Sequence, residues 1–171
     1  LERGCLVVTG QHVESLGDRA VRPALQVAVG ATDRNGKLIP AHLFAPALAR
    51  TASAHDVDLW ALRAVLEWML AHEAELEAYA LVIVPLSGAS MRNEDLAGLL
   101  MTEFMQSPVP PGRICFGLAD HDVVDNVAGV AELIGTLREF GCRFVLDEFG
   151  SGHANYDYIK DIDIDFVTIR S

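Results

Sequence analysis

Two adjacent carboxylates near the end of the chain are the residues best suited to chemistry. Asp147 and Glu148 directly follow the apolar run 144–146, and the glycine-rich stretch 150–152 comes next. Such runs form strands buried on both faces, and ligands of parallel α/β barrels bind at the carboxyl ends of strands. Carboxylate oxygens suit a divalent cation. The pair is therefore a candidate metal site, and the interpretation we favour is an acid cluster that hydrogen-bonds the backbone of a glycine turn.

Apolar runs alternate with helical patterns along the chain, and this alternation predicts the larger fold that positions these acids. Strands are expected at residues 5–8, 24–29, 81–84, 114–116, 144–146 and 164–169. Helices are expected at about 40–50, 56–79, 93–106 and 122–140, with a short one before the last strand. This alternation is typical of a parallel α/β sheet with right-handed crossovers. Six strands are fewer than the eight of a closed barrel, so the sheet is expected to have open edges.

Composition narrows the class of protein. The chain has 171 residues, a hydrophobic fraction of 51% and a net charge of -11. The negative charge argues against nucleic acid or an anionic membrane surface as the main partner. No apolar run approaches the roughly 20 residues of a membrane span. Cys5, Cys115 and Cys142 lack metal-ligand spacing and are interpreted as reduced thiols of a cytoplasmic protein.

The motifs of the last third resemble the EAL domain, a TIM-barrel phosphodiesterase family that cleaves the bacterial second messenger cyclic di-GMP. That family carries DDFGTG after a strand, then YLK, then LKID; here residues 147–152 read DEFGSG, 158–160 read YIK and 167–170 read VTIR, without a gap. The resemblance implies an α/β, TIM-barrel-like EAL fold with about six of its eight strands present. It also implies that residues 1–171 form a single domain of a longer, multidomain signalling protein.

The same resemblance bears on catalysis. Family members hold two divalent metals through carboxylates and an amide, and a lysine assists the attacking water. Acidic positions of that site are kept at Asp147, Glu148 and Asp120, whereas Leu25, Pro85, Gly117 and Thr168 stand where the family has Glu, Asn, Glu and Lys. Leu, Pro and Gly side chains cannot ligate a hard cation, and disturbing even an outer partner costs roughly 10–100-fold. We therefore expect no catalytic residue, no bound metal and no enzyme activity.

Binding of the nucleotide without hydrolysis is a separate expectation. Some EAL domains with altered catalytic motifs act as cyclic di-GMP receptors and grip a phosphate through an arginine, where this chain has Val29. Arg34, in the following turn, and Lys160 remain as candidate nucleotide contacts. For Lys160, pairing with nearby aspartates at the surface is the commoner role, and nucleotide binding is therefore the less favoured interpretation.

The sequence therefore predicts a catalytically inactive, EAL-like regulatory module of bacterial cyclic di-GMP signalling that needs no cofactor. It is expected to act through a protein partner or self-association. The alternatives are a metal-independent cyclic di-GMP receptor and a residual cyclic di-GMP phosphodiesterase. Trp60 and Trp68 lie two turns apart on the expected helix 56–79. Packing against the sheet is their default role, although such a pair can anchor a partner.

Overall fold

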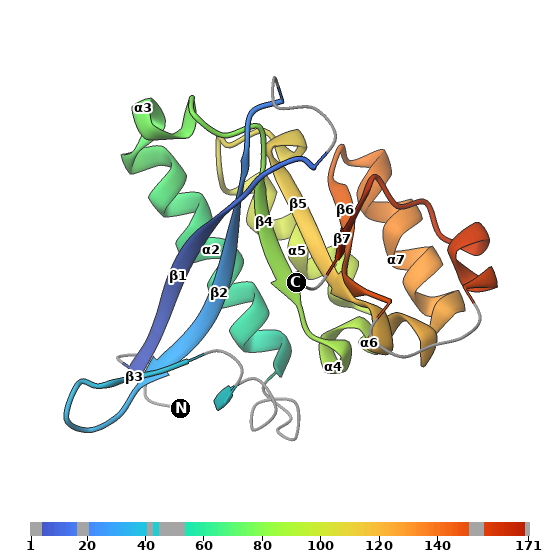
Figure 1. Cartoon of the computed structure of the whole chain (residues 1–171), viewed down its shortest axis with the longest axis horizontal. Coiled ribbons are helices and arrows are strands. Elements are labelled where there is room, and N and C mark those ends of the chain that lie inside the picture. Colours follow the sequence, from blue (N-terminus) through green and yellow to red (C-terminus); the bar gives the residue numbers. More distant parts are fainter. Residues whose placement is uncertain (1–4, 17–20, 41–42, 45–53, 151–155, 170–171) are drawn as a thin grey trace.

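The computed structural model describes residues 5–16, 21–40, 43–44, 54–150 and 156–169. They form a mixed sheet with helices packed on it (Figure 1). The strands are β1 (Leu6–Val13), β2 (Ala24–Thr32), β3 (Leu38–Ile39), β4 (Val82–Leu86), β5 (Ile114–Ala119), β6 (Arg143–Phe149) and β7 (Phe166–Ile169). The helices are α2 (Ala54–Ala71), α3 (Glu73–Leu76), α4 (Gly88–Met91), α5 (Leu96–Met105), α6 (Asp120–Val124) and α7 (Val127–Glu139), with 3₁₀ turns η2 (Pro111–Arg113) and η3 (Asp157–Asp161).

The strands lie in the order β1-β2-β4-β5-β6-β7, and β3 also pairs with β2. Neighbours from β2 through β4, β5 and β6 to β7 are parallel, whereas β1 and β2 are antiparallel, with Leu6 opposite Ala31. The antiparallel pair departs from the expected all-parallel sheet. Its cause is the connection 14–23, which is too short for the crossover of about a dozen or more residues that parallel strands need.

The expected helices are divided more finely than the sequence pattern indicates. The helix expected at 56–79 begins earlier, at Ala54, and breaks at His72, whose φ of -129° and ψ of 40° are not helical. The helix expected at 122–140 is likewise divided into α6 and α7 at Asn126, with φ -151°. Most of the helix expected at 40–50 lies outside the described residues.

The main apolar core lies between the helices and one face of the sheet. Alternate residues of β4, such as Val82 and Val84, point into it with Phe116 and Phe144, whose rings are 6.0 Å apart. Burial of one such side chain contributes about 1.5–3 kcal/mol. The opposite, inner face carries a smaller cluster formed by Leu81, Ile83, Cys115 and Val145. Strand alternation thus separates a helix-covered face from an inner face.

The expected α/β, TIM-barrel-like architecture is present as a partial barrel. In the part of the chain that the structure describes, the sheet has seven strands, one more than expected. The additional strand is the two-residue β3, at a position where the sequence suggests only the approach to a helix. Within the described ranges no helix is long and apolar enough to cross a membrane.

Candidate functional site

The carboxyl ends of the parallel strands hold a polar cluster on the inner face of the sheet. Asp147 lies near the end of β6, and Gln26 reaches it from β2: the Gln26 Nε2 donates to Asp147 Oδ2 at 2.8 Å. Because β4 and β5 stand between these strands, a flat sheet would separate them by about 14 Å, at about 4.8 Å per strand. The contact therefore requires the sheet to curve like part of a barrel.

Neutral donors surround the Asp147 carboxylate. The hydroxyl of Thr168 on β7 donates to Oδ1, and the backbone N–H of Glu148 donates to the same oxygen at 3.0 Å. Gln26 is held in turn by Gln11 of β1, whose Nε2 donates to Gln26 Oε1 at 3.0 Å. Asp147 thus accepts hydrogen bonds from an amide, a hydroxyl and a backbone N–H that belong to three strands.

Glu148 has an unusual backbone. Its φ is 57°, in the left-handed region that residues other than glycine rarely adopt. The pairing of β6 with β7 is irregular between Leu146 and Phe149, and Gly150 follows with a φ of 89°. Backbone strain of this kind costs of order 1–3 kcal/mol and is concentrated at functional sites. Here the strained residue lies directly beside Asp147, one position before the last residue of β6.

Four positions carry residues other than the family's metal ligands and lysine. The structure brings three of them together: Pro85, Gly117 and Thr168. Pro85 and Gly117 are paired on β4 and β5, and a Cβ on Gly117 would lie 3.3 Å from Ile83 Cγ2. They therefore share the inner face with Asp147 and its donor Thr168. Leu25, the fourth position, lies instead in the core on the helix-covered face.

Gln26 is the site residue that sequence reasoning missed. The signal was available, because the apolar neighbours Leu25 and Val27 are both buried, at 8% and 6% exposure. In a strand, a polar residue between two buried apolar residues faces the opposite side. The alternation thus directs Gln26, and not Leu25, towards the strand-end cluster.

Asp120 has a different setting from Asp147. It is fully buried at the start of α6, and its Oδ1 accepts a hydrogen bond from the hydroxyl of Tyr158. Burial, the hydrogen bond and the nearby carboxylate raise the pKa of Tyr158, which keeps the phenol protonated as a donor. Asp120 thereby joins the end of β5 to η3.

The two candidate nucleotide contacts lie apart from this cluster. Arg34 is exposed in the turn between β2 and β3, and Lys160 on η3 forms an ion pair with Asp157 at 2.6 Å. Neither cation forms a hydrogen bond or ion pair with Asp147 in the part of the chain that the structure describes.

The oxygen donors of the cluster can be compared with the metal centre that the family resemblance implies. The cluster offers the carboxylate of Asp147, the amide of Gln26 and the hydroxyl of Thr168. Among the described residues, no three His, Cys, Asp or Glu side chains converge as a metal site would require. Two hard divalent cations together need more oxygen ligands than this. The donors present do not fit a two-metal centre.

Comparison with known proteins identifies the family. A model of the EAL domain matches residues 19–171. The chain belongs to the EAL domain family. Two curated relatives of this EAL chain are named cyclic di-GMP phosphodiesterases: PdeB of Shewanella oneidensis is 25% identical over 169 residues, covering 99% of this chain and 20% of its own length. PdeF of Escherichia coli is 23% identical over 137 residues, which cover 79% of this chain and 18% of the length of PdeF. The chain thus spans about a fifth of the length of these relatives.

Solved structures agree with the fold. The crystal structure of the FimX EAL domain has a TM-score of 0.86 at 20% identity, covering 98% of this chain and 67% of that one. The FimX EAL domain from Pseudomonas aeruginosa, bound to cyclic di-GMP, has a TM-score of 0.85 at 20% identity. The match covers 98% of this chain and 66% of the FimX chain. At these identities the likeness shows the EAL fold, as expected from the sequence.

The expectation that this EAL chain is not an enzyme is contradicted. A relative named a phosphodiesterase matches 99% of the chain, and several further relatives carry the same name. The expectation came from a position-by-position comparison with the family motif, in which Leu25 was aligned with the signature Glu and a metal ligand was therefore taken to be missing. In the structure, the adjacent Gln26 brings an amide to the site. The altered motif positions are therefore not sufficient ground to exclude activity.

Proposed function

We propose that this EAL domain is a regulatory module of cyclic di-GMP signalling that acts through protein contact, with a second copy of the chain as the partner. Family membership and the names of the relatives support the signalling context. The observation that carries the contact is the exposure of β7: Phe166, Val167 and Ile169 are 43%, 46% and 69% exposed. Among the described strands, β7 pairs only with β6. An apolar edge strand of this kind favours pairing with another chain.

Molecular mass as a function of concentration tests this proposal. We expect light scattering on a gel-filtration column to show a mass above that of one chain, rising with concentration. Ile169→Lys should prevent the association, because it places a charge on the exposed apolar edge. Leu38→Lys is the matched control, since Leu38 is 46% exposed on another strand. A single-chain mass at every concentration would refute the proposed contact.

A second candidate function is action on cyclic di-GMP, by binding or by hydrolysis. The names of the curated relatives favour it, and a neighbour in structure is the FimX EAL domain bound to that nucleotide. In this chain, the polar cluster around Asp147 at the strand ends is where such a ligand would bind.

Calorimetric titration with cyclic di-GMP, with and without Mg²⁺, separates the outcomes. Saturable binding of equal strength with and without Mg²⁺ supports a receptor. Mg²⁺-dependent conversion to the linear dinucleotide supports a phosphodiesterase. Asp147→Ala should abolish either result, whereas the exposed Asp163→Ala should not. A folded sample that neither binds nor converts the nucleotide would eliminate this candidate.

A further inference from the structure

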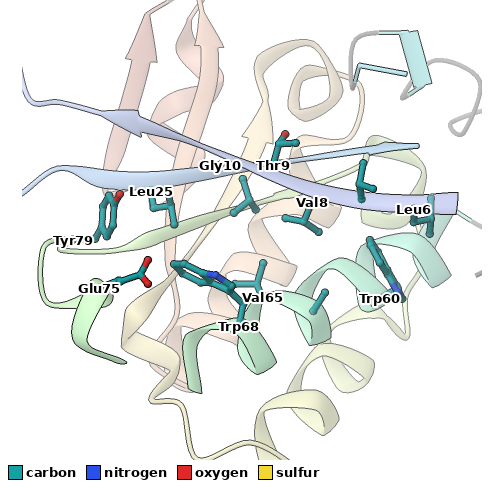
Figure 2. A pocket seen from close by; sticks show the side chains of 13 residues that line it. Leu6, Val8, Thr9, Gly10, Leu25, Trp60, Val65, Trp68, Glu75 and Tyr79 are labelled. Atoms are coloured by element: carbon teal, nitrogen blue, oxygen red, sulfur yellow. The ribbon is translucent and has the colours of Figure 1, made fainter. Parts of the chain in front are cut away.

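The grooves beside the helices differ in what borders them. Trp60 and Trp68 line a groove between the edge strand β1 and α2, which Figure 2 shows. Trp68 packs against the main core, which is the default role expected for the pair. A larger groove, of about 730 Å³, lies along α7 and faces the connection between α4 and α5. We call this larger one the α7 groove.

The walls of the α7 groove belong to the middle of the sheet. α5 connects β4 to β5, and α7 connects β5 to β6. These three strands are consecutive and parallel in the sheet. The groove therefore borders neither β1 nor β7, and its walls come from two neighbouring strand–helix–strand units.

Small and apolar residues form the floor of the α7 groove. They are Met91, Ala97, Gly129 and Leu133. A Cβ on Gly129 would lie 2.5 Å from the Nδ2 of Asn126, so glycine is needed where this amide lies against α7. The hydroxyl of Thr136 donates to the carbonyl oxygen of Glu132 in its own helix, at 3.0 Å, and needs no partner from outside. Such a surface allows a further helix to approach to an axis distance of about 8–10 Å.

Two exposed glycines stand next to lining residues. Gly98 follows Ala97 on α5, and Gly135 precedes Thr136 on α7. A Cβ at either glycine would meet only open space in the part of the chain that the structure describes. Glycine inside a helix costs about 0.8–1 kcal/mol relative to alanine. Packing among the described residues does not explain these glycines, whereas close approach of another helix does.

The rim of the α7 groove is acidic. Glu94, Asp125 and Glu132 line it together with one cation, Arg92, and all four residues are exposed. Within the described ranges none of the four forms an ion pair. Opposite charges across an interface select the partner, so the rim favours a basic one.

A second copy of the chain is a poor match for this rim. The longer described helices, α2, α5 and α7, each carry more acidic than basic residues. The chain as a whole has a net charge of -11. Like charges placed against each other weaken association. The occupant is therefore expected to be a different protein.

We propose that the α7 groove binds an amphipathic helix of a different protein, with small or aliphatic residues on its buried side and lysine or arginine on its flanks. Both walls are helical and no strand edge borders them, so a helix lying in the groove is the mode of recognition that fits. From Asp125 to Thr136 the groove follows α7 for about 16 Å, or about three turns of a bound helix. The basic side chains would pair with the rim carboxylates, and their apolar stems would cover the floor. This inference goes beyond the proposed self-association and uses no residue of β7.

Selection from a phage-displayed library of helical peptides of about 16 residues, with the intact chain as the target, is the first test. We expect enrichment of peptides that carry basic residues on both sides of an apolar stripe. A selected peptide with a fluorescent label is then titrated with the chain and followed by anisotropy. Its binding should weaken as salt is added, because exposed charges are screened.

Charge variants make the test specific. Glu132→Lys should weaken binding of the selected peptide roughly tenfold, because attraction at the rim becomes repulsion. Glu139→Lys is the matched control, since Glu139 is exposed on the same helix outside the groove lining. Equal thermal melting of the two variants would establish that the fold is unchanged.

A variant of the groove floor tests its shape separately from its charge. Ala97→Leu should weaken binding at least as much as the charge reversal, because the longer side chain fills the space that the bound helix needs. Ala128→Leu is the control, since Ala128 is exposed on α7 and does not line the groove.

Three results would overturn the inference. They are the absence of any enriched peptide, equal binding by the Glu132 and Glu139 variants, and loss of self-association in Ala97→Leu, which would identify a second copy as the occupant. Peptide binding should persist in Ile169→Lys, because the α7 groove does not include β7. A single-chain mass with persistent peptide binding would refute self-association alone. Failure here and failure of the proposed function are therefore distinguishable.

Discussion

Replacement of Asp58 tests how the turn after β4 is held. Asp58 lies on α2 and is only 5% exposed. Its Oδ2 accepts hydrogen bonds from the backbone N–H and the hydroxyl of Ser87, both at 2.8 Å. Ser87 in turn caps α4, because its hydroxyl accepts from the N–H of Ser90. This buried carboxylate thus connects a long helix to the turn that follows Pro85.

The expected cost of Asp58→Ala follows from these contacts. Each hydrogen bond to a charged group contributes about 1.5–3 kcal/mol, and removal of the burial penalty of the carboxylate offsets part of the loss. We therefore expect a decrease of about 2–4 kcal/mol in the free energy of unfolding. For a chain of this size, that corresponds to roughly 4–16 °C in Tm. Asp56→Ala is the control, because Asp56 lies on the same helix with an exposed side chain.

The pH dependence gives an independent check. Burial raises the pKa of Asp58 in the folded state. The pH-dependent part of the stability, which comes from this raised pKa, is therefore fully present below the unfolded pKa of about 3.9 and is lost as the pH rises through the raised folded pKa. Asp58→Asn should lack that dependence in urea unfolding. A Tm for Asp58→Ala equal to that of Asp56→Ala, with the same pH profile in Asp58→Asn as in the parent chain, would refute the reasoning.

Three further predictions concern a buried hydrogen bond, two buried thiols and a glycine in a left-handed turn. Tyr158→Phe should lower the free energy of unfolding by about 1.5–3 kcal/mol in urea titration, because Asp120 loses a buried donor; a change below about 0.5 kcal/mol would contradict this. Burial raises the pKa of Cys115 and of Cys142 to about 12, so neither thiol should react with iodoacetamide at pH 8 before unfolding, as mass spectrometry can show. Gly141→Ala should cost about 1–2 kcal/mol, since Gly141 has a φ of 103° after α7; an unchanged unfolding midpoint would exclude this strain.

The sequence predicts the strands of this fold well, because their apolar runs are buried by the sheet itself. It does not predict the break between α2 and α3, since residues 54–79 contain no glycine or proline. The end of α3 at Leu76, before the expected end of the helix at residue 79, is likewise not marked in the sequence, and the structure gives it a tertiary cause. Arg113 donates to the carbonyl oxygens of Leu76 and Tyr79, and Arg22 donates to that of Glu77. These carbonyls are satisfied by side chains from distant segments, which a local pattern does not reveal.

The candidate site was predicted in part. The position of Asp147 at a strand end follows from the apolar run before it. Its contact with Gln26 does not, because that contact depends on curvature accumulated over the strands between β2 and β6. The left-handed backbone of Glu148 cannot be predicted from the sequence either, because glycine is the residue that usually indicates such a conformation.

The order of the strands has a consequence for synthesis on the ribosome. From β4 to β7, each strand pairs with the one made just before it. A chain emerging from the amino terminus can therefore extend its sheet one strand at a time, without waiting for distant segments. The Gln26–Asp147 hydrogen bond is the exception, because 121 positions separate its residues. It can form only after β6 has been added, so the polar cluster is completed late, on a sheet that has already been built.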